Sequence, residues 1–264
     1  MSETTAVAPA IAEMPRGGPS ASWLDRRLQT DALEYTDRYD IPDEVKQKVI
    51  SALDWMGTRA GEHEKNARTA LALVADIPNP RILELGAGHG KLSAKILELH
   101  PTATVTISDL DPTSVDNIAA GELGGHPRVC TKVVDATAID ADDDSYDLVV
   151  FAQAFHHLPP ATACSAIAEA TRVGKRFLVI DLKRQSPFLT LLTPLAMAPL
   201  VLVPRLKPVV HDGFISELRA YSRSAFVALA KAADPQMRTE FLPSTSRFGP
   251  TPTVVVFTRA GATS

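Results

Sequence analysis

The chain has 264 residues, 45% of them hydrophobic, and a formal net charge of −4. This length suits one domain with a small cap, and the composition is that of a globular protein with a real core. The weak negative charge excludes a general electrostatic attraction to nucleic acid. The two cysteines, Cys130 and Cys164, both lie in apolar runs. We therefore expect two buried, unpaired thiols and a reducing, cytoplasmic compartment.

The first part of the chain divides into a tail and a cap. Residues 1–20 are rich in Ala, Pro, Gly, Ser and Thr and lack the basic start and apolar stretch of a signal peptide, so we expect a disordered tail. Helical periods follow at 23–39, after Pro42 and at 63–74. They predict an all-helical cap over residues 21–78.

From Pro80 onward, short apolar runs alternate with helical patterns. This alternation is typical of a doubly wound parallel α/β sheet, and we expect it to form a core over residues 79–182. The expected strands are 82–85, 104–108, 129–134, 146–152 and 176–180.

The alternation ends after Asp181. The apolar segment 188–203 is interrupted by Pro194 and Pro199 and is too short to cross a bilayer comfortably, so we expect a helical lid or acceptor segment over residues 183–221. A helix and two closely linked strands are expected within residues 222–264, and their short link predicts antiparallel pairing. The whole pattern predicts a Rossmann-like, seven-stranded sheet whose last strand is antiparallel.

The most informative motif is the glycine turn between the first expected strand and the next helix. Gly86, Gly88 and Gly90 allow a tight turn and let a ligand lie against bare main chain, and the helix start offers unpaired N–H groups. The spacing differs from the dinucleotide pattern G-x-G-x-x-G, and Leu85 and Leu92 exclude a phosphate-binding P-loop.

Acidic residues mark the ends of the expected strands. In a doubly wound sheet, ligands bind at the carboxyl ends of parallel strands. Glu84 lies beside the turn and suits a ligand with a cationic end. Asp109 could cap the next helix, but Asp111, followed by Pro112, fits that role better. The acids at or close to these strand ends are Glu84, Asp109, Asp135 and Asp181.

Four motifs in register resemble those of class I S-adenosylmethionine-dependent methyltransferases. The short stretch 155–158 is similar to the small-molecule branch that includes quinone and polyketide methyltransferases. The resemblance covers roughly residues 79–182. The matching stretches are 84–90, 108–112, 134–136 and 146–150.

The resemblance implies S-adenosylmethionine as the cofactor and assigns its contacts. Asp109 would accept from both ribose hydroxyls, Asp135 from the adenine amino group, and Ala136 would offer a backbone N–H. Glu84 would help to order the methionine end. The full set of implied cofactor residues is Glu84, Gly86, Ala87, Gly88, Gly90, Asp109, Leu110, Asp135, Ala136 and Ala152.

The acceptor side requires a dry, aligned site and, for an oxygen nucleophile, a nearby base. The candidate bases are His156, His157 and His211, although His211 and Asp212 could equally form an ordinary capped turn. No metal site is expected, because adjacent histidines do not easily face one ion and no third ligand is suitably spaced. The expected acceptor contacts are Phe155, Phe188, Leu192, Asp212, Arg219 and Tyr221.

These observations predict a methyltransferase acting on a small, rather lipophilic acceptor, with a hydroxyl oxygen as the favoured atom. The alternatives are carbon methylation of a quinone or phenol ring, methylation of a carbohydrate or lipid-linked hydroxyl, and a non-catalytic protein that holds the cofactor. We expect no nucleic-acid partner and no transmembrane span. A transient contact with a lipid surface and a homodimer stay open.

Overall fold

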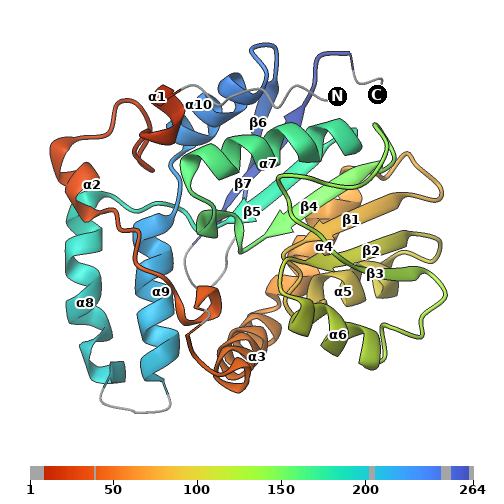
Figure 1. Ribbon diagram of the computed structural model, residues 1–264, viewed down its shortest axis with the longest axis horizontal. Helices are drawn as coiled ribbons and strands as arrows, with labels where there is room; N and C mark the ends of the chain where they lie inside the picture. The colour runs from red at the N-terminus through yellow and green to blue at the C-terminus, as the bar shows by residue number, and fades with distance from the viewer. Residues whose placement is uncertain (1–8, 39, 202–205, 245–250, 262–264) are drawn as a thin grey trace.

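A computed structural model describes residues 9–38, 40–201, 206–244 and 251–261 of the chain. Within them the strands form one seven-stranded sheet in the order β3-β2-β1-β4-β5-β7-β6 (Figure 1). The strands are β1 (Arg81–Leu85), β2 (Thr104–Asp109), β3 (Val129–Val133), β4 (Leu148–Ala152), β5 (Phe177–Asp181), β6 (Arg238–Leu242) and β7 (Thr253–Thr258).

The first five strands pair in parallel, and β7 pairs antiparallel with both β5 and β6. This confirms the predicted fold, including the antiparallel last strand. Cys164 is buried as expected, but Cys130 is exposed. The expectation for Cys130 was wrong because β3 is an edge strand, which its neighbours cover on one side only.

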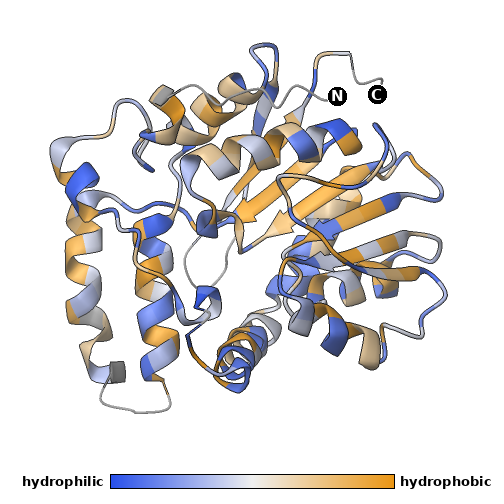
Figure 2. Cartoon of the chain, viewed as in Figure 1, coloured by the Kyte–Doolittle hydropathy of each residue, from blue (hydrophilic) through white to orange (hydrophobic). Residues whose placement is uncertain are grey.

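The core lies on both faces of the sheet. Along the central strands β4 and β5, alternate side chains point to opposite faces: Val149 and Val179 belong to one cluster, and Val150 and Leu178 to the other. The first cluster packs under α7 (Pro160–Val173) and α10 (Arg223–Ala233). The second packs under α4 (Glu62–Ala72) and α5 (Lys91–Leu99). Figure 2 shows these strands as the most hydrophobic part of the fold.

The prediction of a disordered tail over residues 1–20 is wrong for residues 9–20, which the structure describes. Residues 9–12 form α1 (Pro9–Ala12), and Met14 belongs to the core. Arg16 is buried, and its guanidinium donates to the carbonyls of His156 and Arg219. Met14 and Arg16 therefore fix a segment whose Ala, Pro and Gly content predicted a disordered tail. Residues 1–8 lie outside the described part of the chain.

The helical cap is less regular than predicted. The helix expected over 23–39 ends early, as α2 (Trp23–Leu28), and only a short turn, η1 (Tyr35–Asp37), follows it. Between them the hydroxyl of Thr30 accepts from the N–H of Ala32, a local bond that competes with helix formation. The next helix, α3 (Asp43–Ala60), begins directly after Pro42, as predicted.

The insertion after β5 forms two neighbouring helices beside the sheet (Figure 1). They are α8 (Pro187–Val201), which contains both Pro194 and Pro199, and α9 (Lys207–Arg219). Residues 202–205 lie outside the described part. None of the described helices has the length and apolar character needed to cross a membrane.

Candidate functional site

The glycine turn lies at the carboxyl end of β1 and has the backbone shape that only glycine adopts readily. Gly86, Gly88 and Gly90 have φ angles of +61°, +56° and +70°. A Cβ atom on Gly86 would lie 2.7 Å from the ring of Phe151. A Cβ on Gly88 would meet only Ile50 of α3, at 3.4 Å. A side chain at Gly88 would therefore press against α3.

Asp109, at the carboxyl end of β2, faces this turn. Its Oδ2 accepts from the N–H of Gly88 at 2.8 Å, and its Oδ1 from the N–H of Asp111 at 2.9 Å. Asp111 in turn accepts from the N–H of Thr113 and caps α6 (Pro112–Ala120). The capping role thus belongs to Asp111, as the sequence predicts, and the carboxylate of Asp109 is directed to the turn. Burial raises the pKa of Asp109.

Glu84 lies inside the junction between β1 and α5. It is buried, and its Oε2 accepts from both the N–H and the hydroxyl of Ser93. Burial raises the pKa of Glu84 to about 7, against the smaller opposing effect of the Ser93 bonds. A cationic ligand group beside this carboxylate would relieve that cost.

Helix α3 is tied to the turn by His89. Its Nε2 lies 2.8 Å from Oε1 of Gln47, and its Nδ1 lies 2.7 Å from Oδ2 of Asp54. With Ile50, these α3 residues form the covering wall of the turn. The sequence analysis missed Gln47, Ile50 and Asp54, since nothing in the helical period of α3 marks them as neighbours of residues 86–90.

The expected adenine contacts lie along the next strand ends. Leu110 follows β2 and is 57% exposed. Asp135 follows β3, is exposed, and accepts from the N–H and hydroxyl of Thr137. The smaller expected contacts Ala87, Ala136 and Ala152 are partly buried. This edge therefore offers an apolar side chain and a carboxylate at an open surface.

A second cluster lies just past β4, in the short helix η2 (Phe155–His157). His156 is buried between two acids: its Nδ1 lies 2.7 Å from Oδ1 of Asp181, and its Nε2 lies 3.4 Å from Oε1 of Glu34. Burial lowers the pKa of His156, but the two carboxylates outweigh it and raise the pKa to about 10. Such an imidazole keeps its proton at neutral pH, which does not suit a general base.

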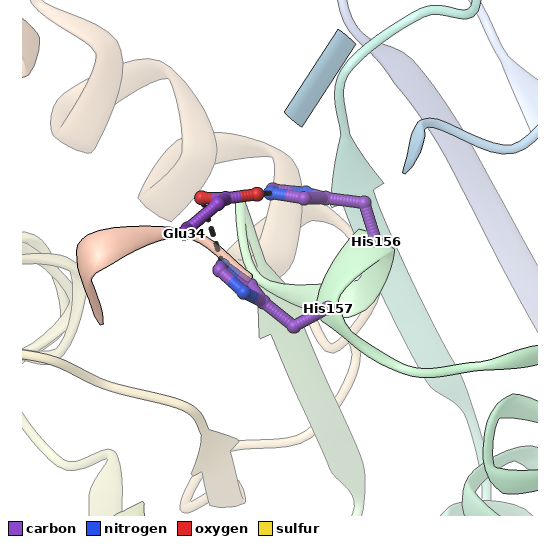
Figure 3. A group of neighbouring side chains, drawn as sticks. All are labelled: Glu34, His156 and His157. Atoms are coloured by element: carbon purple, nitrogen blue, oxygen red, sulfur yellow. Dashed lines mark ion pairs between the residues drawn. The ribbon is translucent and has the colours of Figure 1, made fainter. Parts of the chain in front are cut away.

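His157 approaches the same glutamate from the more open side (Figure 3). Its Nε2 lies 3.7 Å from Oε2 of Glu34, and its Nδ1 lies 2.7 Å from Oδ1 of Asp37. The side chain of His157 is 22% exposed, compared with 3% for His156. Burial acts to raise the pKa of Asp37, but His157 and Arg219 lower it to about 2.

Three of the expected acceptor contacts have structural partners. Arg219 is buried and donates to Asp37 and to the carbonyl of His157. The hydroxyl of Tyr221 donates to the carbonyl of Leu158 at 2.7 Å. Phe155 is fully buried and packs against the rings of Phe151, Phe177, Tyr221 and Phe226. Their placement gives these three residues a packing role and argues against direct contact with an acceptor.

His211 is the accessible histidine of the group. It lies within α9, not in the capped turn that the sequence left open, and its side chain is 43% exposed. Its Nδ1 lies 2.9 Å from Oδ1 of Asp212, which also accepts from the N–H of Tyr35. The ring of Tyr35 packs edge-on against His211 at 5.1 Å. This pair therefore joins α9 to η1.

The remaining expected acceptor contacts, Phe188 and Leu192, are exposed on α8. They share that helix with other exposed apolar side chains. The sequence analysis missed Glu34 and Asp37, whose spacing of three would place them on one face of a helical turn. No local signal links that turn to residues more than 100 positions away.

Comparison with known proteins supports this description of the core. A family model described as a methyltransferase domain matches residues 82–176. The chain is 35% identical over 96 residues to an uncharacterized methyltransferase of Mycobacterium tuberculosis. This alignment covers 36% of this chain and 37% of that relative. It is 33% identical over 104 residues to the malonyl-(acyl-carrier protein) O-methyltransferase of Geobacter sulfurreducens, covering 39% and 38% of the two chains.

Structural comparison extends the similarity to most of the chain. The plantazolicin methyltransferase BpumL, solved in complex with SAH, superposes with a TM-score of 0.62 at 12% identity. The superposition covers 93% of this chain and 95% of that one. The chain therefore has the class I methyltransferase fold, while its alignments with these two curated relatives span less than two fifths of their length.

Proposed function

We propose that the chain is an S-adenosylmethionine-dependent methyltransferase that methylates a hydroxyl oxygen of a small, lipophilic acceptor. One observation carries this proposal. Three left-handed glycines follow β1, and the N–H of the middle one, Gly88, donates to the carboxylate of Asp109 at 2.8 Å. This arrangement lies within the stretch that matches the methyltransferase domain.

The residues present fit the cofactor. Gly88 carries no side chain and adopts a left-handed φ angle, so it would allow a ligand to lie against the backbone. Each oxygen of Asp109 has one N–H partner and a further lone pair for a ribose hydroxyl. Asp135 would accept from the adenine amino group, and Glu84 would face the cationic methionine end. When bound, the cofactor supplies a methyl group that is already activated by a sulfonium.

The chain's own residues then have two tasks. Helix α3 covers the turn through Ile50 and the His89 contacts and would exclude water from it. His211 would take the proton from the acceptor hydroxyl. With the Nδ1 proton directed to Asp212, its Nε2 is the free acceptor, and Asp212 fixes this tautomer.

The preference for a lipophilic acceptor and for oxygen has separate support. The exposed face of α8 carries Phe188, Leu191, Leu192 and Leu195, beside the helix that holds His211. A hydroxyl must lose its proton as it accepts the methyl group, and a histidine oriented by a carboxylate can remove that proton. The similar protein of Geobacter sulfurreducens is an O-methyltransferase.

The direct test is transfer of a labelled methyl group from S-adenosylmethionine to a panel of phenols, quinones and sugars. We expect label in a methyl ether product of an apolar acceptor. Label on a ring carbon would overturn the assignment to oxygen. Tight cofactor binding with no transfer to any acceptor would favour a non-catalytic cofactor-binding protein.

A variant tests the base. His211→Ala should lower kcat at least 100-fold, the usual range for a general base, and should leave the affinity for S-adenosylhomocysteine unchanged. The control is His126→Ala, at a histidine before β3. Full turnover of His211→Ala would exclude His211 as the base.

A further inference from the structure

Buried polar atoms without a well-oriented hydrogen bond gather at one place in the molecule. Among the described residues, seven buried side-chain N and O atoms lack a well-oriented hydrogen bond, and only that of Asp54 lies away from residues 34–37. The other six belong to this segment or to side chains that contact it. They are Glu34 Oε1, Thr36 Oγ1, His156 Nε2, His157 Nδ1, Asp212 Oδ2 and Arg219 Nε. Two of them still lie near an ion-pair partner: Nδ1 of His157 is 2.7 Å from Asp37, and Nε2 of His156 is 3.4 Å from Glu34. The cluster is therefore close-packed but incompletely hydrogen-bonded, which calls for an explanation.

Three of these side chains converge on one point (Figure 3). Glu34, His156 and His157 each offer one ligand atom, and these atoms lie within 4.8 Å of one another. Oε1 of Glu34 lies 3.4 Å from Nε2 of His156, and its other oxygen, Oε2, lies 3.7 Å from Nε2 of His157. In a tetrahedral site with bonds of about 2.0–2.1 Å, neighbouring ligand atoms are about 3.4 Å apart.

Each of the two histidines has a carboxylate beside its Nδ1 atom, as metal-binding histidines usually do. A ligating imidazole usually presents its other nitrogen to a carboxylate, which fixes the ring. Here Nδ1 of His156 lies 2.7 Å from Asp181, and Nδ1 of His157 lies 2.7 Å from Asp37. Both Nε2 atoms are thereby left for the side of Glu34.

Charge gives a further argument. The cluster holds more acids than bases: four carboxylates stand against two guanidinium groups. Buried charges need compensation, and a divalent ion that takes the place of imidazole protons would add positive charge to this acidic cluster. The carboxylates are Glu34, Asp37, Asp181 and Asp212, and the guanidinium groups are Arg16 and Arg219.

We propose that Glu34, His156 and His157 bind one divalent transition-metal ion of the zinc class, with a fourth coordination position open on the side of His157. Two imidazoles and one carboxylate suit zinc better than magnesium or calcium, which prefer oxygen ligands. Three protein ligands with one open position are typical of catalytic zinc sites.

This site replaces the expectation from sequence that no metal is bound. That expectation rested on adjacent histidines facing apart and on the lack of a third ligand. In η2, however, the two rings lie side by side, with centroids 4.4 Å apart and planes 32° apart. The third ligand, Glu34, comes from the irregular segment between α2 and α3.

The location suggests what the open position would hold. A Cβ on Gly86 would lie 3.2 Å from Ala154, two residues before His156, so the metal site borders the glycine turn. A hydroxyl bound to the ion would lose its proton more easily, and His211 could receive that proton. This role rests on the proposed function, whereas the metal site itself does not.

Metal binding can be measured without any substrate. The full chain would be stripped with a chelator, dialysed against Co²⁺ or Zn²⁺, and its metal content determined by mass spectrometry. We expect one equivalent of metal, visible absorption bands for the Co²⁺ form, and a higher Tm with the ion than without it. No stoichiometric binding of either ion would overturn the proposal.

His157→Gln is the decisive variant, because this partly exposed side chain can be changed with the least risk to folding. We expect its metal affinity to fall at least 100-fold and its metal-dependent rise in Tm to vanish. Folded Glu34→Gln should show the same loss of metal affinity. The control, His126→Ala, should bind the metal as tightly as the natural chain. Affinity unchanged in His157→Gln would overturn the site. Titration with S-adenosylhomocysteine separates this result from the proposed function, since His157→Gln should still bind it.

Discussion

The two halves of the sheet's carboxyl edge are built in different ways. The half at β1 and β2 is local: the contact between Gly88 and Asp109 spans 21 positions, and that between Glu84 and Ser93 spans nine. The half at β4 and β5 is assembled from distant segments. Its contacts between Arg219 and Asp37 and between Tyr35 and Asp212 span 182 and 177 positions.

The two halves also depend on different physical effects. The glycine turn depends on backbone shape, which fixes where a ligand can approach. The histidine cluster depends on buried charges, each of which is tolerated only while its partners remain. Changes in the first half should therefore act mainly on ligand binding, and changes in the second half mainly on stability.

The largest expected effect tests the charged half. Arg219→Ala removes a buried guanidinium that contacts Asp37 and the carbonyl of His157. The uncompensated carboxylate should lower the free energy of unfolding by about 3–5 kcal/mol, as measured by urea denaturation. The exposed Arg223→Ala is the control and should cost less than about 1 kcal/mol. Equal stabilities of the two variants would contradict the contrast between the halves.

The next effect tests the backbone half. Gly86→Val places a branched side chain at φ +61° and against the ring of Phe151. It should lower the free energy of unfolding by about 2–4 kcal/mol, and the folded protein should no longer bind S-adenosylhomocysteine. Gly125→Ala, where an added Cβ meets nothing within 4 Å, is the matched control for calorimetry and denaturation. Retained binding in Gly86→Val would show that the turn can deform.

Glu84→Gln tests the glycine-turn half in another way. Here the natural residue should destabilise the folded protein, because its carboxylate is buried. The folded pKa of Glu84 is about 7 and its ordinary value is 4.5. Between these pH values the folded chain binds more protons than the unfolded chain, so stability falls as pH rises. The variant should be more stable by about 3 kcal/mol at pH 8, with no difference below pH 4.5.

Two measurements check this prediction for Glu84. Urea denaturation at several pH values follows the stability, and calorimetry follows the affinity for S-adenosylhomocysteine, which should fall. A variant that is no more stable at pH 8 would contradict the assignment of a buried, costly carboxylate.

The smallest effect concerns the cover over the turn. His89→Ala removes the link between the turn and α3, formed with Gln47 and Asp54. The affinity for S-adenosylhomocysteine should fall by up to about tenfold, since a net hydrogen bond contributes about 0.5–1.5 kcal/mol. His100→Ala, at the end of α5, serves as the control in calorimetry. An unchanged affinity would mean that α3 does not cover the bound ligand.

The sequence predicted the local half well. The strand, the glycine turn and Asp109 follow one another within a short stretch, and each carries its own signal: an apolar run, a glycine spacing and an acid at a strand end. The parallel arrangement of the first strands and the antiparallel β7 also followed from alternation and short links. Each of these features is fixed by neighbouring residues.

The other half could not be predicted in this way. Glu34 and Asp37 lie in a stretch where the sequence predicted a continuous helix that in fact ends at Leu28, and their partners are more than 100 positions away. Arg16 lies in a stretch whose composition suggests a tail. The sequence identified the histidines as important but not their surroundings, because a buried ion pair leaves no pattern in either of its two segments.

The central claim is that the turn at Gly88 and the carboxylate of Asp109 together bind an adenosyl ligand. Calorimetric titration with S-adenosylhomocysteine tests it most directly, using the natural chain, Asp109→Ala, and Asp111→Ala as the control. The account predicts one ligand per chain and an affinity at least tenfold weaker in Asp109→Ala, since a hydrogen bond to a charged group contributes about 1.5–3 kcal/mol. No binding to the natural chain, or equal affinity in Asp109→Ala, would contradict it.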